Sequence, residues 1–352
     1  MAEAAVSPLQ LKIEQPVRDD SSQVLLRSRL RAVSRRMGFR EVVRERLEVV
    51  ANELMSNQLK HAGGGFVQLW EVRAPRPALD LFGLDYGPGI GDLQSALAEG
   101  HSTVGTLGRG LGTIHRLADR AECFTVPESA AGSWQGMAVW ARFYPDTQPA
   151  EPERAHPEVG LYLRAYQDRP ANGDCLCLSE TGEGRLRWLH LDGLGHGEQA
   201  ADAVSGVADL VAGDHPPSTI MGLVGRRLRG TRGAVAALGE VDPASRQGLL
   251  LGIGDVAAYR VDNRSRQHYP FPPGVLGQTR EAKPGQEVDL AVAPGTTLVT
   301  ASDGIRGRWE PAGFPGLFRL HPQLVAFFLG HVMGRATDDR SLFAVRIQDR
   351  PA

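Results

Sequence analysis

A stretch rich in proline and charge, PDTQPAEPERAHP at residues 145–157, is the feature that most limits how this chain can fold. No apolar period crosses it, so it is typical of a linker between domains. With 352 residues, the chain is long enough for about two domains, each burying its own core. We therefore expect an N-terminal arm at 1–19, a first domain at 20–144 and a second domain at 158–352.

The composition of the chain argues against several classes of partner. A formal net charge of −2, with 23% charged residues, gives no electrostatic reason to bind nucleic acid or an anionic membrane. No apolar run is long enough to span a bilayer and the first residues do not resemble a secretory leader, so we expect a cytoplasmic protein. Cys175 and Cys177 would share one face of a strand, but the chain has only three cysteines, so no second pair completes a zinc site.

Residues 41–61, EVVRERLEVVANELMSNQLKH, carry apolar side chains at helical spacing and predict a helix with one buried face. Glu53, Asn57 and Lys60 are spaced four and three residues apart, so they share a neighbouring face of that helix. Taken alone, such a set is typical of a solvated helix face. Two later segments change this interpretation.

Both later segments place glycine where a ligand can approach the backbone. LDLFGLDYGPGI (79–90) predicts a strand that ends at Asp85, followed by a turn with Gly87 and Gly89. An acid in this place can accept a hydrogen bond from the edge of a base. GTLGRGLGTIHRLAD (105–119) predicts a glycine-rich turn leading into a helix, whose free N–H groups can cradle phosphates.

In this order, the three segments resemble the N box and the two glycine boxes of the GHKL ATPase superfamily, over about residues 20–140. The details are similar to the small anti-sigma-factor and switch serine/threonine kinases. The resemblance implies ATP and Mg²⁺ as cofactors, with Glu53 as the base on the attacking hydroxyl, Asn57 as the Mg²⁺ ligand and Asp85 on the adenine amino group. The other implied nucleotide contacts are Lys60, Gly87, Gly89, Gly108, Gly110 and Gly112, under a lid near 92–107.

Some positions keep two interpretations. Lys60 and His61 fit the family pattern, but an exposed place at the helix end, favoured by the helix dipole, explains them equally well. No long helical hairpin precedes the N box, which argues against a two-component histidine kinase.

Acids recur at the expected strand ends of the second half. Asp174 begins the strand DCLCLSE, Asp192 ends LRWLHLD, Asp303 ends TTLVTASD, and Asp338 and Asp339 precede RSLFAVRI. Each acid alone is only a turn former. Four such points can converge in a sandwich, where carboxylates repel unless a cation neutralises them, and carboxylate-rich sites select Mg²⁺ or Mn²⁺.

The stretch DGLGHG (192–197) suits such a site. Gly193 lets its carbonyl turn toward a metal beside the Asp192 carboxylate, and the next two glycines let the chain reverse into a helix. We expect His196 at the rim of the site, at the helix start or against a ligand rather than on the metal.

The motifs NGD, DGLGHG, SDGI and DDRS resemble, in order, those of the metal-dependent PPM phosphatases, over about 155–350, and DGLGHG resembles the SpoIIE/RsbX branch. The expected fold is α+β: a GHKL α/β sandwich followed by a PPM-type α-β-β-α sandwich. The resemblance implies a phosphoserine/phosphothreonine phosphatase with two Mn²⁺ or Mg²⁺ ions and a bridging water as nucleophile. Arg164, Arg169, Arg306 and Arg308 could contact substrate phosphate or be surface charges. The implied ligands are Asp174, Asp192, the Gly193 carbonyl, Asp303 and Asp338, with Asp339 as second choice.

Together the two resemblances imply a bifunctional partner-switching regulator. Its first domain would phosphorylate a serine or threonine on a STAS-domain protein, and its second domain would remove that phosphate. Alternatively, the first domain would only bind ATP and sequester a sigma factor or other regulator; retention of both Glu53 and Asn57 favours catalysis. An ATP-driven conformational machine is disfavoured because no transducer domain is evident. A homodimer stays open.

Overall fold

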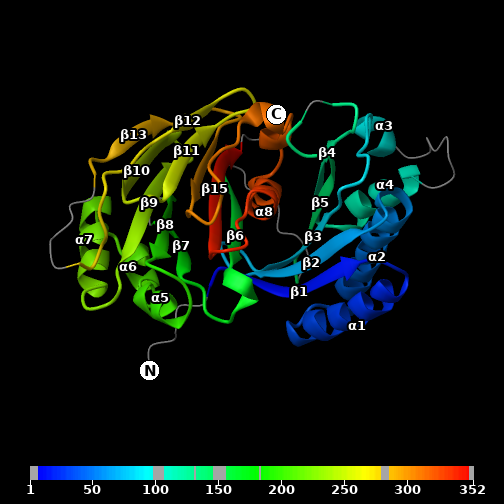
Figure 1. The fold of residues 1–352 in the computed structure, drawn as a ribbon, viewed down its shortest axis with the longest axis horizontal. Coiled ribbons are helices and arrows are strands. Elements are labelled where there is room, and N and C mark those ends of the chain that lie inside the picture. Colours follow the sequence, from blue (N-terminus) through cyan, green and yellow to red (C-terminus); the bar gives the residue numbers. More distant parts are fainter. Residues whose placement is uncertain are drawn as a thin grey trace. The chain divides into compact units, whose positions relative to one another are not determined.

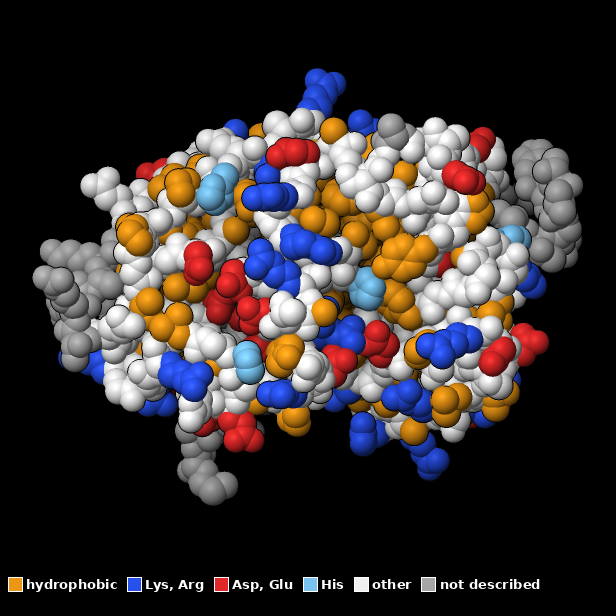
Figure 2. Space-filling view, in the orientation of Figure 1, with side chains coloured by type: hydrophobic (Ala, Val, Ile, Leu, Met, Phe, Trp, Pro, Cys, Tyr) orange, Lys and Arg blue, Asp and Glu red, His pale blue; other side chains and the backbone are white. Residues whose placement is uncertain are grey.

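The structure is a computed structural model, and it describes residues 7–97, 107–130, 132–145, 156–181, 184–278 and 285–348. It divides into two compact units, and each is described by itself. No helix within these ranges is long and apolar enough to cross a membrane. Charged side chains of both signs are spread over the face shown in Figure 2. The N-terminal unit comprises Leu9–Ala150 and Ala312–Leu320, and the C-terminal unit comprises Met1–Pro8, Glu151–Pro311 and His321–Ala352.

The boundaries of these units differ in detail from the expected ones. The unit boundary after Ala150 falls inside the expected linker 145–157, of which residues 146–155 lie outside the described part of the chain. The expected second domain was continuous from residue 158, whereas Ala312–Leu320 groups with the N-terminal unit.

The N-terminal unit consists of one sheet with helices packed against it. Its elements are β1 (Leu9–Val17), α1 (Ser21–Arg36), α2 (Glu41–Asn57), the π-helical turn η1 (Gln58–Ala62), β2 (Gly65–Val72), β3 (Ala78–Leu84), α3 (Leu93–Leu97), α4 (Leu107–Leu117), β4 (Arg120–Val126) and β5 (Gly136–Phe143). The antiparallel sheet has the order β1-β2-β3-β5-β4 (Figure 1). Leu30, Leu47 and Ile114 of α1, α2 and α4 share one fully buried core with Leu69 and Leu81 of the sheet.

The expected N-terminal arm is instead largely a strand of this sheet. Leu9–Val17 pair with β2 as the edge strand β1, with Leu9, Ile13 and Val17 buried. The sequence hides this strand because its register shifts between Leu11 and Ile13 and because it contains Pro16, which is tolerated only at a sheet edge or a bulge.

The C-terminal unit contains two five-stranded antiparallel sheets, ordered β13-β10-β9-β8-β7 and β12-β11-β14-β15-β6. The strands are β6 (His156–Arg164), β7 (Asp174–Glu180), β8 (Leu186–Gly193), β9 (Ala234–Asp242), β10 (Gln247–Ile253), β11 (Ala257–Val261), β12 (Arg266–His268), β13 (Val288–Ala291), β14 (Thr297–Ala301) and β15 (Arg340–Gln348). The helices are α5 (Glu198–Ala203), α6 (Ala208–Ala212), α7 (Pro217–Arg227) and α8 (Pro322–Val332).

The two sheets of this unit are layered between helices. Apolar residues of α6 and α7 share a buried core with β8, β9 and β10, and α8 packs on β6 and β15 of the other sheet (Figure 1). Trp188 of β8 stacks on Phe343 of β15, with ring centroids 4.6 Å apart, so the sheets face each other. The structure thus confirms the expected α+β class, with an α-β-β-α sandwich in the C-terminal unit.

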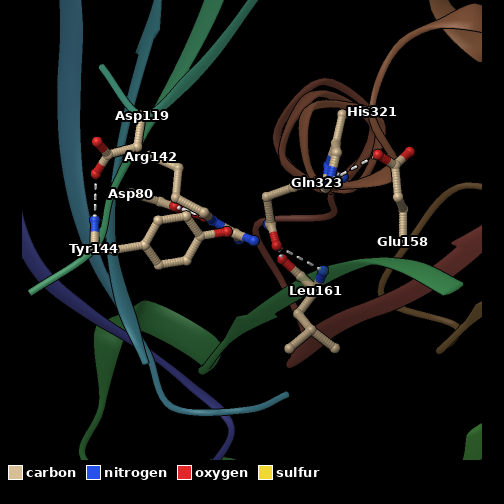
Figure 3. A network of polar contacts seen from close by, with 8 residues as sticks. All are labelled: Asp80, Asp119, Arg142, Tyr144, Glu158, Leu161, His321 and Gln323. Carbon is tan, nitrogen blue, oxygen red and sulfur yellow. Dashed lines mark hydrogen bonds and ion pairs between the residues drawn. The ribbon is translucent and has the colours of Figure 1, made fainter. Parts of the chain in front are cut away.

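Buried polar contacts fix neighbouring elements within each unit (Figure 3). In the N-terminal unit, Arg142 of β5 donates to both carboxylate oxygens of Asp80 on β3, each at 2.7 Å. In the C-terminal unit, the Gln323 side chain on α8 accepts from the Leu161 N–H at 3.2 Å and donates to the Leu161 carbonyl at 2.7 Å. Both contacts satisfy polar groups that would be costly to bury alone.

Gly239→Ala tests the packing of the sandwich. Gly239 lies opposite Trp188 in the β8–β9 ladder, and a Cβ there would overlap the indole ring. We expect a loss of about 1–3 kcal/mol in the free energy of unfolding, because overpacking forces side chains and backbone to shift. Gly222→Ala on α7 is the matched control, since its Cβ would make only ordinary contact. Denaturant unfolding of both variants measures the effect, and equal stability of the two would contradict it.

Candidate functional site

The N box and the second glycine box meet at Gly110. A Cβ on this glycine of α4 would lie 2.9 Å from Glu53 Oε2 and 3.1 Å from both Asn57 side-chain polar atoms. The absence of a side chain therefore lets α4 lie directly against the two residues expected to carry the chemistry. The structure brings these three positions together as the sequence predicts, although their roles stay predictions.

Gln58, which the sequence analysis missed, holds the end of α2 in place. The Gln58 amide donates to the Phe66 carbonyl at 2.9 Å and to the Leu84 carbonyl at 3.3 Å. These bonds tie the π-helical turn after α2 to β2 and β3. Such turns are common at functional sites. The sequence gives only a weak signal for this role of Gln58, because a glutamine on a helix face is ordinarily solvated.

Asp85 lies at the end of β3 in a buried, hydrogen-bonded position. Its Oδ1 accepts from the Gly87 N–H at 3.0 Å and from the Met137 N–H at 3.2 Å. Burial raises the pKa of Asp85, and the two hydrogen bonds oppose that rise. Gly89 has φ of +67°, and a Cβ there would overlap the Val126 carbonyl, so this turn requires glycine.

A cavity of about 150 Å³ joins Asp85 to the N box. Asn57 and His61 line it from the helix, and Ile90, Leu111 and Met137 give it apolar walls. Burial and the neighbouring Lys60 charge lower the pKa of His61. Lys60 and His61 are both exposed, as the solvent-facing alternative predicts, and of the two His61 also lines the cavity.

The glycine-rich segment is already helical at Leu107. Gly108, Gly110 and Gly112 all lie within α4, and their roles as phosphate contacts stay predictions. Residues 98–106, most of the expected lid at 92–107, lie outside the described part of the chain.

In the C-terminal unit, Asp174 and Asp192 lie directly opposite each other in the β7–β8 ladder. Burial raises the pKa of Asp192 to about 9, with further contributions from Asp174, Asp303 and Asp255. Burial raises the pKa of Asp174 as well, and Asp339 and Asp303 add to it. Like charges in facing positions are destabilising unless something neutralises them.

Asp303 and Asp338 belong to the same electrostatic cluster. Burial raises the pKa of Asp303, and the charges of Asp338 and Asp255 raise it further, while Arg335 lowers it. Asp255, in the turn after β10, is a member that the sequence analysis missed, although it too lies beside a glycine at the end of a strand. Figure 2 shows acidic side chains gathered on the face in view.

The terminal acid pair divides into two roles. Both Asp339 oxygens are used by backbone groups, since Oδ1 accepts from the Tyr166 N–H at 2.7 Å and Oδ2 from the Gly173 N–H at 2.9 Å. Asp339 therefore anchors the chain that leads into β7. This use of both oxygens favours Asp338 as the candidate ligand.

The donor set fits a hard divalent cation in its chemistry, because clustered carboxylates and a carbonyl are oxygen ligands. Among the described residues, no group of three or more His, Cys, Asp or Glu side chains already has the geometry to hold a metal ion. The mutual effects on pKa still place the carboxylates within electrostatic reach of one another.

The remaining expected residues surround this cluster. Gly193 closes β8, where a Cβ would lie 2.9 Å from the carbonyls of Ala200 and Gly173. His196 is exposed, with its ring centroid 4.8 Å from that of Tyr166, as expected for a rim residue.

The four candidate arginines show no shared phosphate site. Arg164 is paired with Asp168 at 2.5 Å, and Arg169 lies over the Tyr166 ring. Arg306 donates to the Val332 carbonyl at 2.8 Å, and Arg308 is exposed.

Gly110→Ala tests the contact between α4 and the N box. We expect at least tenfold weaker Mg-ATP binding, because the new methyl group would displace Glu53 and Asn57. The melting temperature should hold or rise, since alanine favours a helix. Titration calorimetry measures binding, with Gly91→Ala as control because open space surrounds Gly91. Unchanged affinity in Gly110→Ala would contradict the proposed packing.

Stability against pH tests the carboxylate cluster. The folded-state pKa of Asp192 is raised to about 9, so the folded protein binds its proton more tightly than the unfolded chain. Without added metal, the contribution of Asp192 to stability is therefore largest at low pH and is lost as pH rises from about 4, the unfolded value, through 9. Mn²⁺ should restore stability at neutral pH.

Melting temperatures from pH 5 to 9, with and without Mn²⁺, measure this effect. Asp192→Asn should flatten the pH dependence of the melting temperature and reduce its increase with Mn²⁺. Asp202→Asn, at an exposed position of α5, should behave like wild type. Identical pH profiles for wild type and Asp192→Asn would rule out the electrostatic cluster.

Solved structures with a similar chain trace have been found for just over half of this chain. One is described as the bacterial stressosome, a modular system adapted to control secondary messenger signalling; it is 29% identical, with a TM-score of 0.47, covering 54% of this chain and 99% of that one. RsbX in complex with magnesium is 18% identical, with a TM-score of 0.47 and coverage of 57% and 99%. The RsbU and RsbW domains of a Mycobacterium tuberculosis protein are 19% identical, with a TM-score of 0.47 and coverage of 57% and 62%.

Sequence comparisons concern the N-terminal unit. Residues 18–143 match the family described as the histidine kinase-like ATPase domain. Over 90 residues, the chain is 34% identical to the serine/threonine-protein kinase RsbT of Bacillus subtilis (strain 168), covering 25% of this chain and 68% of that protein. Together with the cavity between Asp85 and the N box, these matches show that the chain belongs, through its N-terminal unit, to the histidine kinase-like ATPase family.

Proposed function

We propose that this chain is a cytoplasmic partner-switching regulator that joins a protein serine/threonine kinase to a metal-dependent protein phosphatase. The observation that carries the phosphatase half is the facing pair of buried Asp174 and half-buried Asp192, whose mutual repulsion a bound cation would relieve. The kinase half is supported by the contact of Gly110 with Glu53 and Asn57, and by the similarity to RsbT.

In the N-terminal unit, Asp85 would bind the adenine amino group, and the apolar walls of the cavity would hold the ring. Asn57 would bind Mg²⁺, which neutralises developing phosphate charge when it is bound. Glu53 would accept the proton of the attacking hydroxyl, while Gly108 and Gly110 would donate N–H groups to the phosphates.

In the C-terminal unit, Asp174, Asp192, Asp303, Asp338 and the Gly193 carbonyl would hold two Mn²⁺ or Mg²⁺ ions. Such ions supply a water of lowered pKa as nucleophile. Asp255 joins this set as a further candidate, because it acts electrostatically on both Asp192 and Asp303. Arg335, whose charge opposes the rise in the pKa of Asp303, is the candidate for contacting the substrate phosphate.

The proposed substrate is a STAS-domain phosphoprotein, phosphorylated by the first unit and dephosphorylated by the second. This partner follows from the family resemblance of both halves, as does a homodimer. The competing proposal keeps the phosphatase and makes the first unit an ATP-gated module that binds a sigma factor or other regulator without transferring phosphate.

A time course of phosphate on a STAS-domain protein tests both activities at once. With labelled ATP, Mg²⁺ and Mn²⁺, Asp192→Asn should accumulate label that wild type removes, because only metal-assisted hydrolysis is lost. Asp202→Asn should follow wild type. If Asp192→Asn and wild type remove phosphate from pre-labelled partner equally fast, the phosphatase assignment is wrong.

Glu53→Gln separates the kinase from the binding module. Loss of the base should lower phosphotransfer at least a hundredfold while ATP affinity stays within about threefold, since base catalysis contributes about 10²–10⁴. Glu45→Gln, an exposed acid on the same helix, is the matched control. Phosphotransfer at wild-type rate in Glu53→Gln would overturn the assigned base, and no transfer by wild type would favour the binding module.

A further inference from the structure

A buried histidine connects the two sheets of the C-terminal unit. His190 lies on β8 and is fully buried. Its Nδ1 is 2.9 Å from Thr300 Oγ1 on β14, and its Nε2 is 2.7 Å from Ser341 Oγ on β15. The ring therefore bridges the sheets in the layer that also holds the stacked Trp188 and Phe343.

When the Asp174 carboxylate is ionised, as it is in a metal ligand, the hydrogen bonds around His190 can run in only one direction. The Ser341 hydroxyl donates to Asp174 Oδ2 at 2.6 Å. A hydroxyl has a single proton, so Ser341 must accept from His190, and the ring must carry its proton on Nε2. Nδ1 of the neutral imidazole is then an acceptor, and the Thr300 hydroxyl donates to it. The chain of donors runs from Thr300 through His190 and Ser341 to Asp174.

We infer that His190 is a positioning residue that, through Ser341, fixes the orientation of the Asp174 carboxylate for metal binding. The inference rests on the proposed function in one respect, the role of Asp174 as a ligand. Ser341 holds Oδ2, and this bond restricts rotation of the carboxylate. Hydrogen-bonded partners of a ligand set its orientation and basicity, and their loss costs about 10–100-fold in metal affinity.

Ser341 also connects this relay to another strand end of the acidic cluster. Its N–H donates to Ser302 Oγ at 3.0 Å, and its carbonyl accepts from the Ser302 N–H at 3.1 Å. Ser302 directly precedes Asp303 and also hydrogen-bonds Asp174. His190 is itself two residues before Asp192. One network thus fixes three carboxylate-bearing strand ends relative to one another.

Mn²⁺ titration calorimetry on the full chain tests the relay without using catalysis. Thr300→Val, which removes only the far end of the relay, should weaken Mn²⁺ binding severalfold, and Ser341→Ala should weaken it by at least tenfold. Thr297→Val is the matched control: Thr297 is buried on the same strand, and its hydroxyl has no hydrogen-bond partner within the described residues. His190→Gln, which keeps a donor near the Nε2 position, should bind more tightly than His190→Leu.

Nuclear magnetic resonance of the histidine nitrogens provides a second readout, independent of metal. Long-range ¹H–¹⁵N spectra should show His190 protonated at Nε2 and bare at Nδ1. The Nδ1–H tautomer would overturn the relay, as would equal Mn²⁺ affinity in Thr300→Val, Ser341→Ala and Thr297→Val. A wild-type chain that binds no Mn²⁺ would instead overturn the proposed metal site, whatever the tautomer shows.

Discussion

Two carboxylates, one buried and one half-buried, face each other across one ladder and are the constraint on which the C-terminal unit depends. The β7–β8 register sets Asp174 opposite Asp192, and their proximity opposes ionisation of both. Stability alone does not favour this pair, because an apolar pair of similar size carries no charge and avoids the cost of burying one. The pair therefore destabilises the sandwich locally. The surrounding polar network holds the carboxylates where a bound cation can offset their repulsion.

In the N-terminal unit, three segments that are distant in the sequence meet at one cavity. The N box lies on α2 and the adenine-side acid lies at the end of β3, while α4 comes from a third segment. Gly110 permits the closest contact among them, since any side chain there would push Glu53 and Asn57 away. Glycine therefore serves here as a packing residue within a helix rather than as a hinge before it.

The sequence predicted what depends on local chemistry. Acids beside glycine turns marked the strand ends, so Asp174, Asp192 and Asp303 were placed on the correct elements. Residues whose role comes from packing escaped it: Asp255 has no local partner, and His190 meets Thr300 and Ser341 only after two sheets stack. The helix expected after DGLGHG is two short helices, α5 and α6, because Gly206, with φ of +68°, separates them.

The edge strand β1 has one further consequence. An exposed strand edge is a template on which another chain can add a strand, and such edges promote aggregation. At Pro16 this edge offers no N–H, and the Pro16 carbonyl already accepts from the Gln15 side chain at 3.0 Å. Lys12, paired with Glu71 at 2.7 Å, adds charge to the same strand. Continuation of the sheet into a neighbouring molecule is therefore disfavoured along this edge, and self-association through β1 would have to use side-chain contacts instead of backbone pairing.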